Sequence, residues 1–124
     1  MRKIETLNDW IGCIVESGKA IIVEGMKDRR ALTEVGITNP IIMINGPKPG
    51  LYNVVESAAQ HKQIIILTDF DKKGKELYGK LKKDLCKNGV EIDNFFREWL
   101  RRNTKLSHIE GLDSYLENSE LVKY

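Results

Sequence analysis

The chain has 124 residues, of which 41% are hydrophobic and 31% are charged, and its net charge is +2 at pH 7. This length favours one compact domain, and this composition excludes collagen-like, low-complexity and intrinsically disordered chains. No apolar run approaches the roughly 18 residues that span a membrane, and the N-terminus lacks the apolar core of a signal peptide, so we expect a cytoplasmic protein.

The first predicted element is an amphipathic helix over residues 6–17. Its apolar side chains recur at helical spacing, at Leu7, Trp10, Ile11, Ile14 and Val15. Thr6 suits the N-cap position, and Asp9 completes an imperfect capping box with it. Gly18 then ends the helix.

Three short apolar runs rich in β-branched residues predict strands over residues 20–23, 40–44 and 63–68. None of them has a polar face, so both sides must be covered, which is typical of parallel strands between layers of helices. A fourth candidate strand over residues 90–93 alternates polar and apolar residues and is therefore expected to be a half-exposed edge.

Helix-length segments lie between the strands, over residues 27–35, 51–61 and 72–88, and a tail of two short helices follows. This alternation predicts an α/β fold, a three-layer α/β/α sandwich around a four-stranded, mainly parallel sheet. We expect a single domain over residues 1–124, with its core at about 19–95, an N-terminal helix over 6–17 and a helical tail over 95–124.

The strand ends carry the residues suited to chemistry, because ligands of open α/β sheets bind at the carboxyl ends of the strands. Glu24 follows the first strand, and Asp69 and Asp71 follow the third. Three carboxylates at one edge repel each other and call for a cation, and Mg²⁺ is held by one or two carboxylates with waters and phosphates. Asp71 would also serve as a plain helix cap.

Basic residues in the same loops are candidates for positioning a phosphate, although each would equally suit a solvated surface. They are Lys27, Arg29, Arg30, Lys48, Lys72 and Lys73. From Lys72 to Lys105 the chain carries eleven basic and five acidic residues, a net charge of +6 that leaves −4 for the rest. Such a segment indicates either a phosphate-binding face or a solvated lysine-rich helix.

Three short motifs in order, each after a strand, resemble the Toprim family. They are Glu24-Gly25, Asn45-Gly46 and Asp69-Phe70-Asp71-x-x-Gly74. Toprim is a metal-binding α/β module, Rossmann-like in its layers, that is shared by topoisomerases, primases, old-family nucleases, recombination-repair proteins and a ribosomal-RNA maturase. The resemblance covers about residues 19–95, and it is nearer to small stand-alone Toprim proteins and the maturase nucleases than to topoisomerases.

This resemblance implies roles for the matching residues. Glu24 would be a general acid/base or a metal ligand, and Asp69 and Asp71 would hold Mg²⁺, with Mn²⁺ as the other candidate. The remaining matches are loop residues: Gly25, Asn45, Gly46 and Gly74. Because Lys73 and Gly74 stand where some Toprim motifs have a third acidic residue, the number of ions, one or two, stays open.

Two functions follow from the resemblance. The first is magnesium-dependent, nuclease-like hydrolysis of RNA or DNA. The second is a metal-dependent module that binds nucleic acid or a nucleotide without cutting it and works with a partner protein or as a homodimer. A receiver-like or phosphatase-like domain with Asp69 as phosphoacceptor is a third reading, but Lys73 stands where haloacid-dehalogenase-type phosphatases carry Thr.

Several other residues are interpreted as structural. His61 suits a helix C-terminus, and His108 has no second ligand near it in sequence. Cys13 and Cys86 are expected to be buried thiols of a reducing compartment and not a disulfide. On the tail helix, three arginines are expected either to extend a nucleic-acid track or to be plainly exposed: Arg97, Arg101 and Arg102.

Overall fold

The computed structural model describes residues 3–122, without the side chains of residues 119–122. Strands and helices alternate as predicted and then give way to a helical tail. In chain order the elements are α1 (Leu7–Ser17), β1 (Ala20–Val23), α2 (Met26–Glu34), β2 (Ile41–Met43), α3 (Leu51–Ala58), β3 (Gln63–Ile66), α4 (Lys72–Lys87), β4 (Glu91–Ile92), α5 (Phe95–Asn103), the 3₁₀ turn η1 (Ile109–Gly111) and α6 (Leu112–Val122).

The four strands form one parallel sheet in the order β2-β1-β3-β4, which confirms the predicted fold class. β4 is the predicted edge strand, with one exposed and one half-buried residue. β2 forms the other edge, and its three residues are only half-buried. Its side chains still pack on both faces of the sheet, Ile41 and Met43 against one core and Ile42 against the other, so the expected cover on both sides is present but only partial.

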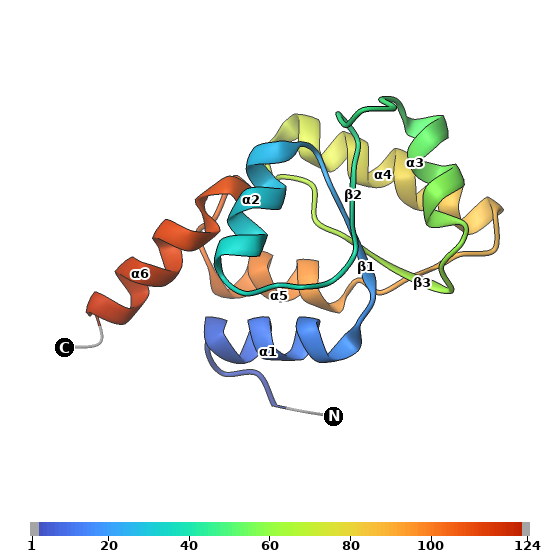
Figure 1. Cartoon of the computed structure of the whole chain (residues 1–124). Coiled ribbons are helices and arrows are strands. Elements are labelled where there is room, and N and C mark those ends of the chain that lie inside the picture. The colour runs from blue at the N-terminus through green and yellow to red at the C-terminus, as the bar shows by residue number, and fades with distance from the viewer. Residues whose placement is uncertain (1–2, 123–124) are drawn as a thin grey trace.

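Side chains alternate between two buried cores, one on each face of the sheet. Ile21 and Val23 of β1 point into the core beneath α1, α2 and α5, while Ala20 and Ile22 point into the core beneath α3 and α4. Strand geometry produces this division, since successive side chains leave a strand on opposite faces. The result is the predicted three-layer sandwich, and α6 carries the chain end away from it (Figure 1).

Local signals fix the helix ends. Thr6 and Asp9 form the predicted capping box of α1, with Asp9 N–H donating to Thr6 Oγ1 and Thr6 N–H donating to Asp9 Oδ2. Gly18 ends α1 in a left-handed conformation, at φ 63°, which favours glycine because a side chain would be strained there.

The cysteines correct one expectation. Both are free, as expected, but Cys13 is only half-buried and Cys86 is exposed. On α4 the core-facing positions belong to Leu81 and Leu85, so the neighbouring Cys86 lies on the outer face. Within the described residues no helix has both the length and the apolar character that crossing a membrane requires.

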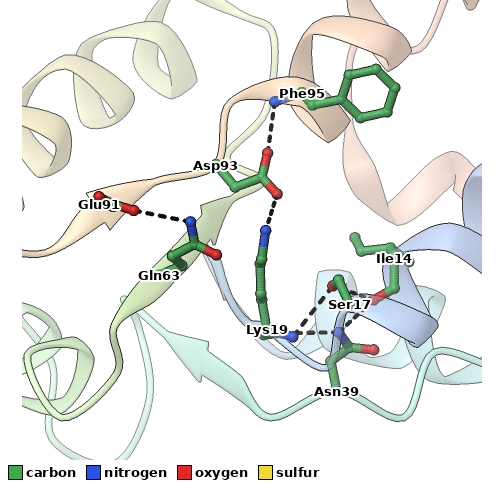
Figure 2. A network of polar contacts seen from close by, with 8 residues as sticks. All are labelled: Ile14, Ser17, Lys19, Asn39, Gln63, Glu91, Asp93 and Phe95. Atoms are coloured by element: carbon green, nitrogen blue, oxygen red, sulfur yellow. Dashed lines mark hydrogen bonds and ion pairs between the residues drawn. The ribbon is translucent and has the colours of Figure 1, made fainter. Parts of the chain in front are cut away.

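A polar network around Lys19, which directly precedes β1, fixes where α5 begins (Figure 2). The Lys19 ammonium lies 2.6 Å from Asp93 Oδ2 in a largely buried ion pair. Asp93 Oδ1 accepts a hydrogen bond from the backbone N–H of Phe95, at 3.1 Å. The entry to β1 is thereby tied to the first residue of α5.

Candidate metal centre

Three strand ends meet at the carboxyl edge of the sheet, as the topology predicted. Past the strands, Asn45 N–H donates to the Glu24 carbonyl at 2.8 Å, which continues the pairing of β1 with β2. The Glu24 carboxylate turns the other way, and its Oε2 accepts the Asp69 backbone N–H at 2.8 Å. Glu24 therefore links the segment after β1 to the segment after β3.

The two aspartates after β3 each have one oxygen held by a backbone amide. Asp69 Oδ1 accepts the N–H of Ile109 at 2.8 Å. Asp71 Oδ1 accepts the N–H of Gly74 at 2.8 Å and caps α4. Glu24, Asp69 and Asp71 together form what we call the acidic edge. Asp71 is thus both a helix cap and a member of this edge, and the two predicted roles are compatible.

His108 joins these aspartates, which the sequence did not indicate. Its Nε2 lies 3.3 Å from Asp71 Oδ2, and one ligand atom each from Asp69, Asp71 and His108 lie within 4.8 Å of one another. The expectation that His108 has no second ligand nearby is wrong, because the chain folds back over the strand ends after α5. Glu24 adjoins this group through Asp69 but is not part of it.

Burial raises the pKa of two of these carboxyls. For Glu24, burial is the main cause, the hydrogen bond from Asp69 N–H lowers the pKa, and the charges of Asp69 and Asp71 raise it. For Asp69, burial is again the main cause, and the hydrogen bond from Ile109 N–H lowers the pKa. Crowded carboxylates in a partly desolvated place are the electrostatic situation that a bound cation relieves.

Arg97 of α5 supports the segment that carries the aspartates. Its side chain is buried, at 5% exposed, and its guanidinium donates to the carbonyls of Thr68 and Asp69, the latter at 3.0 Å. The guanidinium carbon also lies 4.6 Å from the ring centre of Phe70 and 4.8 Å from that of Tyr78. Both predictions for Arg97, a nucleic-acid contact or an exposed residue, are therefore wrong.

The close packing around Gly74 explains why the motif ends in glycine. A Cβ at this position would lie 2.0 Å from the carbonyl oxygen of Asp69, far inside van der Waals contact. The first turn of α4 thus packs directly against the backbone of Asp69. Only a residue without a side chain lets the helix start this close to the aspartates.

The predicted phosphate-binding residues are scattered over this end of the molecule. Lys72 and Lys73 are exposed in the first turn of α4, and the charge of Lys73 lowers the pKa of Glu24. Lys27 and Arg30 line a hollow together with Glu34, Glu110 and Asp113.

Arg29 and Lys48 are exposed. Lys48 and Gly46 line a different hollow, between β2 and α3. Gly25 caps α2, and its N–H donates to Asp28 Oδ2 at 3.0 Å. Of the predicted basic residues, those at the start of α4 thus have the clearest connection with the acidic edge.

A divalent cation fits this donor set. Two carboxylates and one imidazole offer oxygen and nitrogen ligands from one small patch, and their other polar atoms are already bonded within the protein. Hydrogen bonds of this kind orient the metal-binding side chains of metalloproteins. Sequence reasoning found both aspartates by their place after a strand, whereas nothing local to His108 or Arg97 indicates their contacts.

The Toprim domain family model matches residues 19–98 of the chain. UPF0292 protein TK1411 of Thermococcus kodakarensis is 39% identical over 90 residues, which are 69% of this chain and 66% of that relative. A UPF0292 protein of Thermococcus sibiricus is 33% identical over 86% of this chain and 82% of its own length. A solved structure described as a putative protein from Aquifex aeolicus superposes with a TM-score of 0.77 and 28% identity, over 86% of this chain and 98% of that one.

Proposed function

This chain belongs to the Toprim domain family, and on that premise we propose that it hydrolyses phosphodiester bonds of RNA or DNA with a divalent metal. Toprim domains bind divalent metals and belong to nucleic-acid processing, so the domain implies a metal-dependent function related to nucleic acid. The observation that carries the proposal is the acidic edge. Asp69 and Asp71 lie together there, with the Glu24 carboxylate on the backbone N–H of Asp69.

Asp69 and Asp71 would hold the ion, Mg²⁺ or Mn²⁺. When bound, a divalent ion at this edge neutralises charge on a phosphodiester oxygen. Each aspartate is fixed by a backbone amide, from Ile109 or from Gly74, so little side-chain freedom is lost on binding. This preorganisation favours a defined position for the phosphate.

Glu24 is the residue that we assign to proton transfer. One of its oxygens is engaged by the Asp69 amide, which fixes the carboxyl group beside the metal ligands. In hydrolysis, water attacks phosphorus as the bond to the leaving oxygen breaks. Glu24 would take a proton from that water or give one to the leaving oxygen.

Lys72 and Lys73 would position the phosphate. They stand in the first turn of α4, beside Asp71, and the N-terminus of a helix also favours anions. Their charge balances that of the acidic edge, so an anionic polymer can approach carboxylates that would otherwise repel it.

A cleavage assay tests this function. Structured RNA, duplex DNA and single-stranded DNA are incubated with the protein in Mg²⁺, Mn²⁺ or EDTA, alongside Glu24→Gln and the matched control Glu56→Gln on the exposed side of α3. We expect metal-dependent cutting that Glu24→Gln reduces by about 100-fold or more and Glu56→Gln leaves unchanged. Gln retains an oxygen for the Asp69 amide, so the fold should persist.

Two results would overturn the proposal. The absence of cutting on all three polymers, or equal cutting by Glu24→Gln and the wild type, would contradict hydrolysis at this edge. In the first case, metal-dependent binding of a polymer by the same protein would identify a non-cleaving module that needs a partner.

A further inference from the structure

We propose that His108 is the third ligand of the metal centre and that the resulting set of two carboxylates and one imidazole selects Mn²⁺ over Mg²⁺. This inference rests on the proposed function, because it assumes that Asp69 and Asp71 bind a divalent ion. It adds a ligand from the segment after α5, outside the acidic motifs, and it chooses between the two candidate ions.

The separation of the donor atoms suits one ion. Ligands at about 2.1 Å in adjacent positions of an octahedral shell lie about 3 Å apart. His108 Nε2 and Asp71 Oδ2 are separated by 3.3 Å, and the group of three falls within 4.8 Å. The two side chains are 49% and 42% exposed, so small rotations suffice to close the shell.

The orientation of His108 is fixed by its neighbour. Its Nδ1 lies 2.9 Å from Ser107 Oγ. With the proton on Nδ1, that nitrogen donates to the hydroxyl, and Nε2 is left with a lone pair on the side of Asp71. Histidine ligands of metals are usually held in this way, with the second ring nitrogen bonded to a protein group.

The backbone on both sides of His108 is fastened to the aspartate segment. The carbonyl of Ser107 accepts the N–H of Phe70 at 2.9 Å, and the N–H of Ile109 donates to Asp69 Oδ1 at 2.8 Å. His108 lies between these two anchors. Its place beside Asp71 is therefore set by two hydrogen bonds of its own segment and does not depend on the side-chain contact alone.

The ligand chemistry decides the ion. Mg²⁺ prefers oxygen ligands and keeps much of its water, whereas imidazole is a ligand for first-row transition ions. Two carboxylates alone would accept either ion. The added nitrogen strengthens binding of Mn²⁺ and contributes little to binding of Mg²⁺.

The test measures metal binding without any nucleic acid. Calorimetric titration of the metal-free protein with MnCl₂ and MgCl₂ compares the wild type with His108→Ala and with His61→Ala. His61 is the matched control because it is the other of the two histidines and lines a hollow at the opposite end of the strands. We expect His108→Ala to weaken Mn²⁺ binding by about tenfold or more, to change Mg²⁺ binding by less than about threefold, and His61→Ala to change neither.

A spectroscopic measurement separates ligation from a structural effect. Electron spin-echo modulation of bound Mn²⁺ in the wild type should show coupling to an imidazole nitrogen, which His108→Gln should abolish. Circular dichroism of each variant checks that the fold is retained.

The outcomes are distinguishable. Equal Mn²⁺ affinity in the wild type and His108→Ala, or no nitrogen coupling, overturns the role of His108 and leaves the two aspartates as the metal site. If the wild type binds neither ion, the proposed function fails as well. Loss of both ions in Asp71→Asn, with no change in His108→Ala, contradicts this inference alone.

Discussion

At the scale of single residues, Asp28 is a carboxylate buried for a structural reason. It is 7% exposed, and its Oδ2 accepts the N–H of Gly25 at the start of α2. Burial raises the pKa of Asp28, the hydrogen bond from Gly25 lowers it, and the charges of Glu24 and Glu110 raise it. The carboxylate that bonds to the start of α2 is therefore disfavoured electrostatically when it is charged.

This electrostatic effect predicts a pH dependence of stability. Because the pKa of Asp28 is raised in the folded state, its contribution is greatest below the unfolded pKa of about 3.9 and is lost as pH rises through the folded pKa. Asp28→Asn keeps an oxygen for the Gly25 amide and does not titrate. We expect the free energy of unfolding of this variant, relative to the wild type, to increase between about pH 4 and pH 7.

Urea unfolding of both proteins at several pH values in this range measures the difference. A difference that stays constant with pH would contradict the assignment. The sign matters here, since an ordinary surface aspartate in an ion pair would give the opposite trend.

At the scale of elements, α5 acts as a brace for the aspartate segment. Two of its three arginines, Arg97 and Arg101 at i and i+4, have very different surroundings. Arg97 is buried against the carbonyls of Thr68 and Asp69, whereas Arg101 is exposed and pairs with Glu98 on its own helix, at 2.9 Å. The Lys19–Asp93 pair fixes the start of α5 and so helps to determine which arginine reaches the site.

The two arginines therefore predict contrasting substitutions. Arg97→Met leaves two carbonyl acceptors without their donor, each at a cost of roughly 1–3 kcal/mol. We expect it to lower the free energy of unfolding by about 3 kcal/mol and to weaken metal binding. Arg101→Met removes only an exposed, solvent-screened ion pair, so its effect on the free energy of unfolding should be much smaller.

Urea unfolding and calorimetric titration with Mn²⁺ compare these variants. Arg97→Lys keeps the charge but not the planar fork, so it should recover part of the stability and little of the metal affinity. If Arg97→Met and Arg101→Met behave alike, the bracing role of Arg97 is wrong.

At the scale of the whole molecule, charge is segregated. The segment from Lys72 to Lys105 carries +6 in a chain of net charge +2, and much of that charge lies on α4, which begins at the acidic edge. The lysines of α4 are all exposed: Lys72, Lys73, Lys75, Lys80, Lys82, Lys83 and Lys87. Under the proposed function, a basic helix leading from the acidic edge would suit an anionic polymer longer than a single nucleotide.

This arrangement predicts strongly salt-dependent binding. The logarithm of the affinity for single-stranded RNA, measured by fluorescence anisotropy, should fall linearly with the logarithm of the salt concentration. Replacing Lys72 and Lys73 with Gln should reduce the slope by about two. The same replacement of Lys62, which lines a hollow at the opposite end of the strands, should leave the slope unchanged. A wild-type affinity insensitive to salt would exclude nucleic acid as the partner.

The sequence by itself determined the elements and the meeting of Glu24 with Asp69. Apolar runs such as residues 20–23 report burial on both faces, caps such as Thr6 report helix ends, and the carboxyl ends of parallel strands share one edge whatever the details of packing. These are consequences of local pattern and of sheet geometry. These features do not depend on how the helical tail packs.

The tertiary structure alone decided the other half of the site. Ile109 meets Asp69 across 40 residues of sequence, and Arg97 meets Thr68 across 29. Such contacts depend on the direction in which the chain returns after β4, which no local periodicity encodes. For the same reason the sequence indicates neither that β2 is an edge strand nor that His108 lies beside the aspartates. Both properties depend on which elements the fold places next to them.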